Sequence, residues 1–206
     1  MSNIILAAGT QTRWNAQKYK GIPVIKQLIE IEGEVLIERI QRQFPGAIVV
    51  TKTNDIKKHS HKWFDPAENI VTLATLFSTR DLWEDWTTVL LGDVNYGDHT
   101  IGLIENQTDE MMFYGDKGEI YAIKFSLKSS INVIGCINNI VSAPMFERKY
   151  GKLWNLYRML NATDFRTHII KDYFTRVSDC KDFDTQKQYI RYAKNQRVRK
   201  QDTGLL

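Results

Sequence analysis

The stretch IILAAGTQTR, residues 4–13, decides the fold expected of this chain. Its first five residues are apolar and have the length of a buried strand, and the run stops at Gly9. A polar loop follows and carries Arg13. At the carboxyl end of a buried strand, such a loop can present backbone N–H groups and a cation to phosphates. The stretch therefore indicates a phosphate-binding loop, although an ordinary turn after a strand can have the same composition.

Strands and helices are expected to alternate along the chain, a pattern typical of a parallel, doubly wound sheet. The fold class that follows is α/β, a Rossmann-like three-layer α/β/α sandwich with a mostly parallel twisted sheet. The expected strands are residues 2–8, 47–51, 69–72, 87–91 and 173–177, with a hairpin formed by 109–115 and 119–127. The expected helices are residues 34–44, 55–62, 75–86, 152–160, 162–170 and 185–199.

Length and composition suit one domain spanning residues 1–206. The chain has 206 residues, of which 43% are hydrophobic and 25% charged, as in ordinary globular proteins. No apolar run is long enough for a signal-peptide core or a membrane span. Cys136 and Cys180 lack the CxxC spacing of metal sites. We therefore expect a cytoplasmic protein with two reduced thiols and no membrane partner.

The positive charge is concentrated near the C-terminus. The formal net charge is +4, yet residues 187–200 hold six basic residues and no acidic one. Without that stretch, acidic residues outnumber basic ones by two. It can be interpreted as a nucleic-acid or anionic-surface contact, or as a solvated terminal helix. One short cluster favours the solvated helix, so we do not expect nucleic acid as a partner.

The connection after the first loop carries Lys18, Lys20 and Lys26. Residues 26–39, with the sequence KQLIEIEGEVLIER, predict a short strand, a glycine turn and an amphipathic helix. Here the chain resembles the sugar-phosphate and alcohol-phosphate nucleotidyltransferases, such as molybdenum-cofactor guanylyltransferase-like proteins. Their openings follow LAAG-x-G-x-R and PKQL-x-x-I-x-G-x-PLLER. Gln11 and Ile25 depart from this pattern. The matching residues are Ala7, Ala8, Gly9, Arg13, Lys26, Gln27, Leu28, Ile31, Gly33, Leu36, Glu38 and Arg39.

A second feature is the sequence LLGDV at residues 90–94, where a buried strand ends in Gly-Asp. Asp93 then lies at the carboxyl edge of the sheet, close to the loop after the first strand. A single Asp after a strand can also be a turn or helix-cap residue. The segment resembles the metal-binding strand end of the same family, which implies that Asp93 holds Mg²⁺.

A third feature is DFDT at residues 182–185, before the last expected helix. Asp184 or Thr185 can cap that helix. The family ends with a similar D-x-D-T-x-x-x-Y segment, which Asp184, Thr185 and Tyr189 fit. The resemblance implies that Asp184 is the second metal ligand, with Asp182 as the substitute candidate.

The resemblance implies a glycosyltransferase-A-like fold and a Mg²⁺-dependent nucleotidyltransferase. The enzyme would transfer a nucleoside monophosphate from a nucleoside triphosphate to a sugar 1-phosphate or a phosphoalcohol such as phosphocholine, and release pyrophosphate. Residues 1–108 would hold the nucleotide, 109–178 would shape the acceptor pocket, and 179–206 would close the site. Arg13 and Lys26 would be catalytic, and Asp93 and Asp184 would bind the metal. The nucleotide-binding residues would be Leu6, Ala7, Ala8, Gly9, Thr10, Arg13 and Lys26.

Two alternatives remain open at the level of sequence. The segment 182–184 is a literal D-x-D, as in glycosyltransferases that consume a nucleotide sugar. Gly9, Arg13 and Lys26 argue against that activity, because a nucleotide sugar needs no triphosphate grip. The other alternative is a non-catalytic nucleotide or nucleic-acid binding module that uses the basic residues 187–200.

Overall fold

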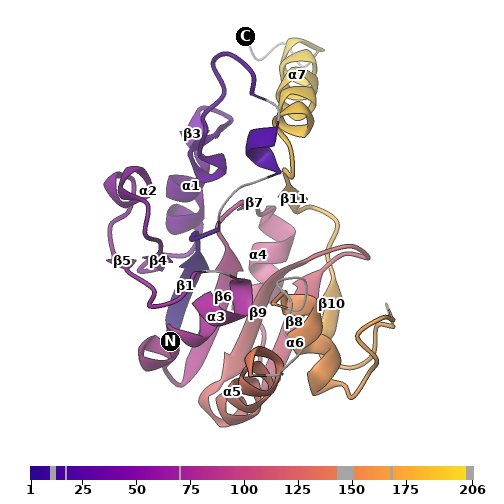
Figure 1. The fold of residues 1–206 in the computed structure, drawn as a ribbon. Helices are drawn as coiled ribbons and strands as arrows, with labels where there is room; N and C mark the ends of the chain where they lie inside the picture. The colour runs from indigo at the N-terminus through magenta and orange to yellow at the C-terminus, as the bar shows by residue number, and fades with distance from the viewer. Residues whose placement is uncertain (10–12, 17, 70, 143–150, 168, 203–206) are drawn as a thin grey trace.

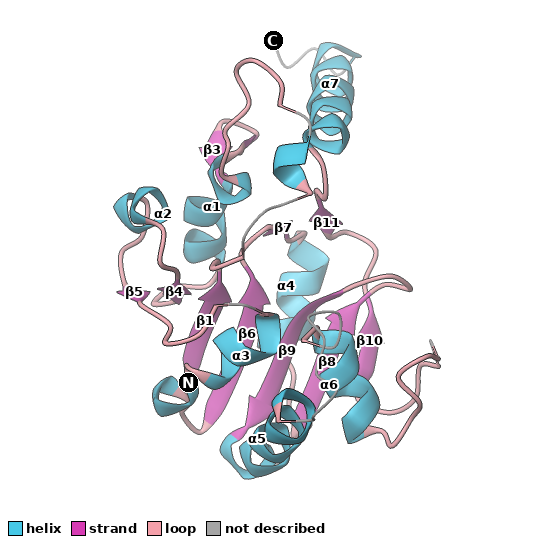
Figure 2. Ribbon diagram, in the orientation of Figure 1, coloured by secondary structure: helices cyan, strands magenta, loops and turns pink. Residues whose placement is uncertain are grey.

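The computed structural model describes residues 1–206 except 10–12, 17, 70, 143–150, 168 and 203–206. In this described part, a seven-stranded sheet forms the centre and helices cover both faces (Figures 1 and 2). Its strands are β1 (Ser2–Leu6), β4 (Ile48–Val50), β5 (Trp63–Phe64), β6 (Trp86–Leu91), β8 (Met111–Gly115), β9 (Ile120–Ser126) and β10 (Phe174–Arg176).

The strand order is β10-β8-β9-β6-β1-β4-β5. Strand β9 pairs antiparallel with β6 and β8, whereas the other pairings between the described strands of this sheet are parallel. The expected mostly parallel sheet is therefore confirmed. The helices are α1 (Leu36–Gln43), α2 (Asn54–Lys58), α3 (Thr72–Phe77), α4 (Asp98–Glu105), α5 (Leu127–Val141), α6 (Leu153–Leu160) and α7 (Gln186–Asp202).

Neighbouring residues of one strand enter two different cores, because side chains alternate between the faces of a sheet. In β1, Ile5 packs with α1 and α4, whereas Ile4 and Leu6 pack with α3, α5 and α6. Figure 2 shows the sheet with helices on both faces. Both faces are buried, so β1 is a continuous apolar run and not an alternating one. These two cores make the predicted three-layer sandwich.

The carboxyl ends of β1 and β6 lie side by side. The strands are parallel, Leu6 is paired with Leu91, and the N–H of Gly92 donates to the carbonyl of Leu6 at 2.9 Å. A Cβ at Gly92 would lie 3.0 Å from Leu6 O and Ala7 Cβ. Glycine is therefore the residue that lets the chain leaving β6 pass so close to β1.

Two short two-stranded sheets complete the fold at this edge. One is the hairpin of β2 (Glu30–Ile31) and β3 (Glu34–Val35), and the other pairs β7 (Val94–Asn95) with β11 (Lys181–Asp182). In the second sheet, Asp182 lies opposite Val94. This pairing brings the segment before α7 next to the residue that follows Gly92. Short 3-10 helices are η1 (Trp14–Ala16), η2 (Lys26–Leu28) and η3 (Arg80–Leu82).

Most expected elements are present with shifted ends. The strands expected at 2–8, 47–51, 87–91 and 173–177, the hairpin, and the helices expected at 34–44, 55–62, 152–160 and 185–199 are all present, with ends that differ from the expected ones. The segment expected to begin as a strand at Lys26 forms η2 instead. The structure adds α4 and α5, which the sequence patterns did not indicate.

Three expected elements are wrong. The strand at 69–72 is replaced by β5, and Thr72 already begins α3. The helix expected at 75–86 ends at Phe77, and Trp86 begins β6. The helix expected at 162–170 does not form in the described residues. Helix α6 ends at Leu160, and Ala162 has a φ of +47°, a left-handed conformation common after helix ends.

The two cysteines are free thiols, as expected. In the described ranges, no helix is both long and apolar enough to cross a membrane. Helix α7, the last described element, projects from the body of the molecule (Figure 1). Its basic residues Lys187, Arg191 and Lys194 are exposed, in keeping with a solvated helix.

Candidate active site

A cavity of about 340 Å³ opens at the carboxyl edge of β1 and β6. Its size is in the range of small-molecule sites. The expected site residues reach it from four separate parts of the chain: the loop after β1, η2, the turn after β6 and the segment before α7. The residues expected to act that line it are Leu6, Ala8, Gly9, Arg13, Lys26, Asp93 and Asp184, together with Asp182.

Two expected nucleotide-binding residues are placed differently. Ala7 has its side chain in the core, and its N–H donates to the carbonyl of Val50 at 2.9 Å. That N–H already has a partner in the sheet, so Ala7 supports the loop from beneath. Thr10, like Gln11, lies outside the described residues.

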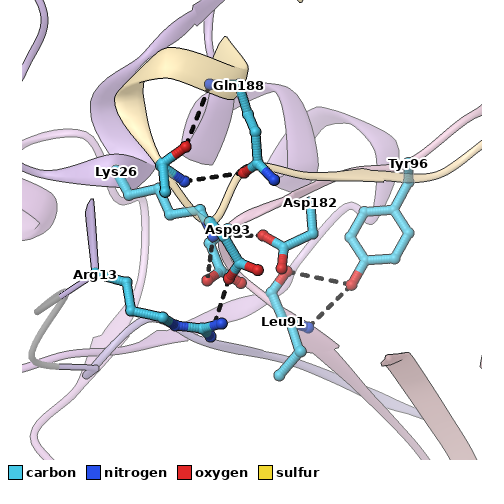
Figure 3. A network of polar contacts seen from close by, with 9 residues as sticks. Arg13, Lys26, Leu91, Asp93, Tyr96, Asp182 and Gln188 are labelled. Atoms are coloured by element: carbon cyan, nitrogen blue, oxygen red, sulfur yellow. Dashed lines mark hydrogen bonds and ion pairs between the residues drawn. The ribbon is translucent and has the colours of Figure 1, made fainter. Parts of the chain in front are cut away.

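Lys26 joins two carboxylates in the centre of the cavity (Figure 3). Its ammonium lies 3.0 Å from Asp93 Oδ2 and donates a hydrogen bond to Asp182 Oδ1. Only 6% of the Lys26 side chain is exposed. Burial lowers the pKa of Lys26, but Asp93 and Asp182 outweigh it, and the pKa lies above its ordinary value. Lys26 is therefore held as a cation.

Asp182 is the more deeply placed of the two carboxylates. Burial and then the charge of Asp93 raise its pKa to about 6, although Lys26 acts in the opposite direction. The two carboxylates repel each other and share only one ammonium, so the site favours binding of additional positive charge. The β7–β11 pairing fixes this arrangement because Asp93 precedes β7 and Asp182 ends β11.

Arg13 and Asp184 form a second ion pair nearer to solvent. Arg13 Nη2 lies 2.9 Å from Asp184 Oδ1, and 67% of the Arg13 side chain is exposed. The position of Arg13 is set by the next residue, Trp14, which is buried and donates its indole N–H to Pro23 O at 2.9 Å. The structure therefore brings Asp182 to Asp93 through Lys26, and brings Asp184 to Arg13.

Thr185 makes the side-chain contacts of a cap at the start of α7. Its hydroxyl accepts from the Gln188 N–H at 3.3 Å, and its N–H donates to Gln188 Oε1 at 3.0 Å. These reciprocal bonds form a capping box. The sequence left Asp184 and Thr185 as alternative caps. With Thr185 in this role, the Asp184 carboxylate faces the cavity and Arg13.

Tyr96 supports the turn that carries Asp93, a role that the sequence did not indicate. Its buried hydroxyl accepts from the Leu91 N–H at 2.9 Å (Figure 3). The same hydroxyl donates to Tyr121 O at 2.7 Å. Burial, followed by the charges of Cys180 and Asp93, raises the pKa of Tyr96 well above its ordinary value, which keeps the hydroxyl protonated. Tyr96 thus ties the end of β6 to β9.

Glu119 and Lys152 also line the cavity, and neither was a candidate from sequence. Lys152 Nζ lies 3.8 Å from Glu119 Oε1. Burial raises the pKa of Glu119, and Lys152 partly offsets that effect. Both residues lie in the part of the chain, 109–178, that was expected to shape an acceptor pocket.

The aromatic residues of α6 are mainly part of the core. Trp154 touches the cavity, but only 4% of it is exposed. Its ring stacks on Phe174 with centroids 5.5 Å apart, and the Arg158 guanidinium lies 5.6 Å from its centroid. Exposed aromatic rings can bind a quaternary ammonium by cation–π contact. The described rings of α6 are packed against other side chains, which favours the core interpretation.

No family model matches the chain, and no curated protein matches its sequence. Solved structures match over nearly its whole length. One is the CTP:phosphocholine cytidylyltransferase of Streptococcus pneumoniae, with 14% identity, a TM-score of 0.62, and 93% of this chain and 96% of that chain covered.

Two further solved structures match with similarly low sequence identity and similarly high coverage. The inositol-1-phosphate CTP transferase of T. maritima has 10% identity and a TM-score of 0.58, with 90% of each chain covered. A Bacillus anthracis protein assigned as a glucose-1-phosphate thymidylyltransferase has 14% identity and a TM-score of 0.59, with 93% of each chain covered. The chain therefore has the fold of these nucleotidyltransferases.

Proposed function

We propose that this protein is a nucleotidyltransferase that transfers a nucleoside monophosphate from a nucleoside triphosphate to a phosphorylated small molecule and releases pyrophosphate. The observation that carries the proposal is the convergence of Lys26, Asp93 and Asp182 in one cavity, next to the Arg13–Asp184 pair. This cavity lies at the carboxyl edge of the sheet, where ligands bind in open α/β folds.

The reaction needs little from the protein beyond positioning and charge. A phosphate oxygen of the acceptor attacks the α-phosphorus, a new P–O bond forms, and the bond to the β-phosphate oxygen breaks with pyrophosphate leaving. The attacking oxygen is already anionic, so no side chain has to remove a proton. Catalysis then rests on aligning two anions and neutralising the charge that develops.

Arg13 and Lys26 supply that positive charge in the proposal. Arg13 is exposed at the mouth of the cavity and suits the β- and γ-phosphates, because its planar guanidinium can bind two oxygens at once. Lys26 is deeper and suits the α-phosphate or the acceptor phosphate. Ala8 and Gly9 line the cavity beside them, and we propose that their backbone N–H groups contribute further donors.

The carboxylates fit a Mg²⁺ ion, which prefers oxygen ligands and takes one or two carboxylates together with phosphates. In the described part of the chain, no group of three acidic, His or Cys side chains forms a complete metal site. Asp93 and Asp182 share a cation already, so we propose them as the protein ligands, with Asp184 as an outer carboxylate. When bound, Mg²⁺ would neutralise phosphate charge and assist departure of pyrophosphate.

Glu119 and Lys152 are proposed to contact the acceptor. They lie in the same cavity as Lys26 and come from a different part of the chain than the nucleotide loop. The half-buried Glu119 carboxylate can accept hydrogen bonds from hydroxyls or pair with a cationic group, and Lys152 can bind an anionic group. This pair therefore suits a polar, phosphorylated small molecule.

The decisive experiment is a pyrophosphate-release screen. The full chain is incubated with Mg²⁺, each of the four common nucleoside triphosphates, and a panel of sugar 1-phosphates and phosphoalcohols. Acceptor-dependent pyrophosphate release with one combination supports the proposal, and Asp93→Asn provides the inactive control. Consumption of a nucleotide sugar without pyrophosphate release indicates a glycosyltransferase instead. Salt-sensitive nucleic-acid binding that disappears when residues 187–206 are deleted indicates a binding module.

A further inference from the structure

We propose that the Lys26 ammonium is a built-in counterion of the Asp93–Asp182 pair, which a divalent cation displaces, releasing Lys26 toward phosphate. This inference rests on the proposed function, because it concerns the same cavity. It adds a competition between a side chain and a metal ion for one pair of carboxylates.

The first argument is geometric. Lys26 Nζ lies 3.0 Å from Asp93 Oδ2 and hydrogen bonds to Asp182 Oδ1, so it sits between the two carboxylates (Figure 3). The three residues come from η2, the turn after β6 and β11. The Asp93 and Asp182 side chains are 33% and 20% exposed, so both reach the cavity where a cation could enter.

The second argument is the charge balance. Two carboxylates that face each other with one ammonium between them retain a net negative charge. A divalent cation neutralises both charges and coordinates carboxylate oxygens directly. An ammonium and a divalent cation on the same oxygens would repel each other at short range. Tight binding of one therefore requires the other to leave.

The third argument is the chemistry of lysine. Its charge is carried on a flexible four-carbon stem, so the ammonium can move while the backbone of η2 stays in place. Lys26 itself lines the cavity, as do Arg13 and Gly9 of the phosphate loop. A released ammonium would therefore lie near the phosphates of a bound nucleotide. Lys26 would then be available to phosphate only when the carboxylates hold a metal ion.

The test measures Mn²⁺ binding to the full chain without nucleotide, by electron paramagnetic resonance of free Mn²⁺. Lys26→Met is compared with the wild type and with Lys152→Met, which removes the same charge from the same cavity but not from between the two aspartates. We expect Lys26→Met to bind Mn²⁺ at least ~10-fold more tightly than the wild type, and Lys152→Met to change affinity by less than ~3-fold. Equal effects of the two variants, or weaker binding by Lys26→Met, would overturn the proposal.

A second measurement uses the wild type, in case Lys26→Met does not fold. Lysine acylation is followed by mass spectrometry with and without Mg²⁺, at matched ionic strength and without nucleotide. We expect Mg²⁺ to raise labelling of Lys26 several-fold and to leave Lys152 unchanged. Unchanged or reduced labelling of Lys26 contradicts the displacement.

The two proposals fail separately. If the enzyme releases pyrophosphate but neither Mn²⁺ affinity nor Lys26 labelling behaves as stated, only the displacement is wrong. If both behave as stated and no triphosphate yields pyrophosphate, the transfer reaction is wrong and the competition for the carboxylates stands.

Discussion

The Arg13 guanidinium lies 2.9 Å from the Asp184 carboxylate and joins the loop after β1 to the segment before α7. These residues are far apart in the sequence, and both line the cavity. An exposed ion pair of this kind stabilises a protein by at most about 1 kcal/mol. Arg13 can therefore exchange Asp184 for a phosphate at little cost to the fold.

Arg13→Ala is expected to lower the rate of pyrophosphate release by at least ~10²-fold, because it removes a positive charge from the leaving phosphates. The rate is measured at saturating acceptor with varied nucleoside triphosphate. The matched control is Arg42→Ala, since Arg42 is also exposed and ion-paired, at 2.8 Å from Glu34, on the outside of α1. A loss no greater than that of the control removes Arg13 from the proposed mechanism.

The aspartates should differ in importance. Asp93→Asn and Asp182→Asn are each expected to lower the EDTA-sensitive rate of pyrophosphate release by at least ~10²-fold. Both carboxylates contact the Lys26 ammonium, at the position proposed for Mg²⁺. Asp184→Asn is expected to lower that rate by less than ~10-fold, because it removes only one exposed ion pair.

Pyrophosphate release is measured for all three variants, with circular dichroism to check that each folds. The substitutions are isosteric, so the fold should be retained. If Asp184→Asn loses as much activity as Asp93→Asn while Asp182→Asn remains active, the metal ligands are Asp93 and Asp184 instead.

The sequence pattern predicts the sheet well where both faces are covered. The apolar run from Ile4 identifies β1 because successive side chains enter two different cores. Helix α5 is harder to predict because its sequence is rich in β-branched residues, which have low helix propensity. Its one local signal is Ser126, whose hydroxyl accepts from the Ser129 N–H as an N-cap.

The candidate site is predictable only up to the residues that end a strand. Asp93 follows β6, so its place at the sheet edge can be inferred from the apolar run before it. Whether Asp182 or Asp184 comes close to Asp93 depends on the pairing of β7 with β11, which joins residues distant in the sequence. Glu119 and Tyr96 lie in loops with no distinguishing motif, so only the tertiary structure brings them to the site.

Helix α4 illustrates the same dependence on distant residues. Its N-terminus is capped by Asp179, whose carboxylate accepts from the Thr100 N–H at 3.1 Å and from the Thr100 hydroxyl. A Cβ at the N-cap residue, Gly97, would lie 2.2 Å from Asp179 Oδ2. Glycine is therefore needed there for the close approach of Asp179, although its φ of −85° is ordinary.

Gly97→Ala should accordingly destabilise the protein, because it displaces a helix cap that typically contributes ~1 kcal/mol. For a chain of this size, this lowers the melting temperature by roughly 2–4 °C. Gly102→Ala in the same helix is the control, because the space at its Cβ is open. Alanine favours a helix by ~1 kcal/mol over glycine, so that variant should melt higher. The two melting temperatures, measured by calorimetry, should move in opposite directions, and a shared direction contradicts the close-approach argument.

The Asp179 carboxylate is also expected to make the free energy of unfolding depend on pH. Burial raises the pKa of Asp179, but the hydrogen bonds from the Thr100 hydroxyl and N–H outweigh it, and the pKa is lowered in the folded state. A lowered folded-state pKa stabilises the fold above the unfolded-state pKa, which is about 3.9 for aspartate. That stabilisation is lost as the pH falls through the folded-state value.

We compare the wild type with Asp179→Asn, which keeps the shape and cannot ionise, by urea denaturation at several pH values. The wild type should be more stable at pH 6, and its advantage should shrink below about pH 4. An advantage that stays constant down to pH 2.5 would show that the Asp179 charge does not contribute to the cap.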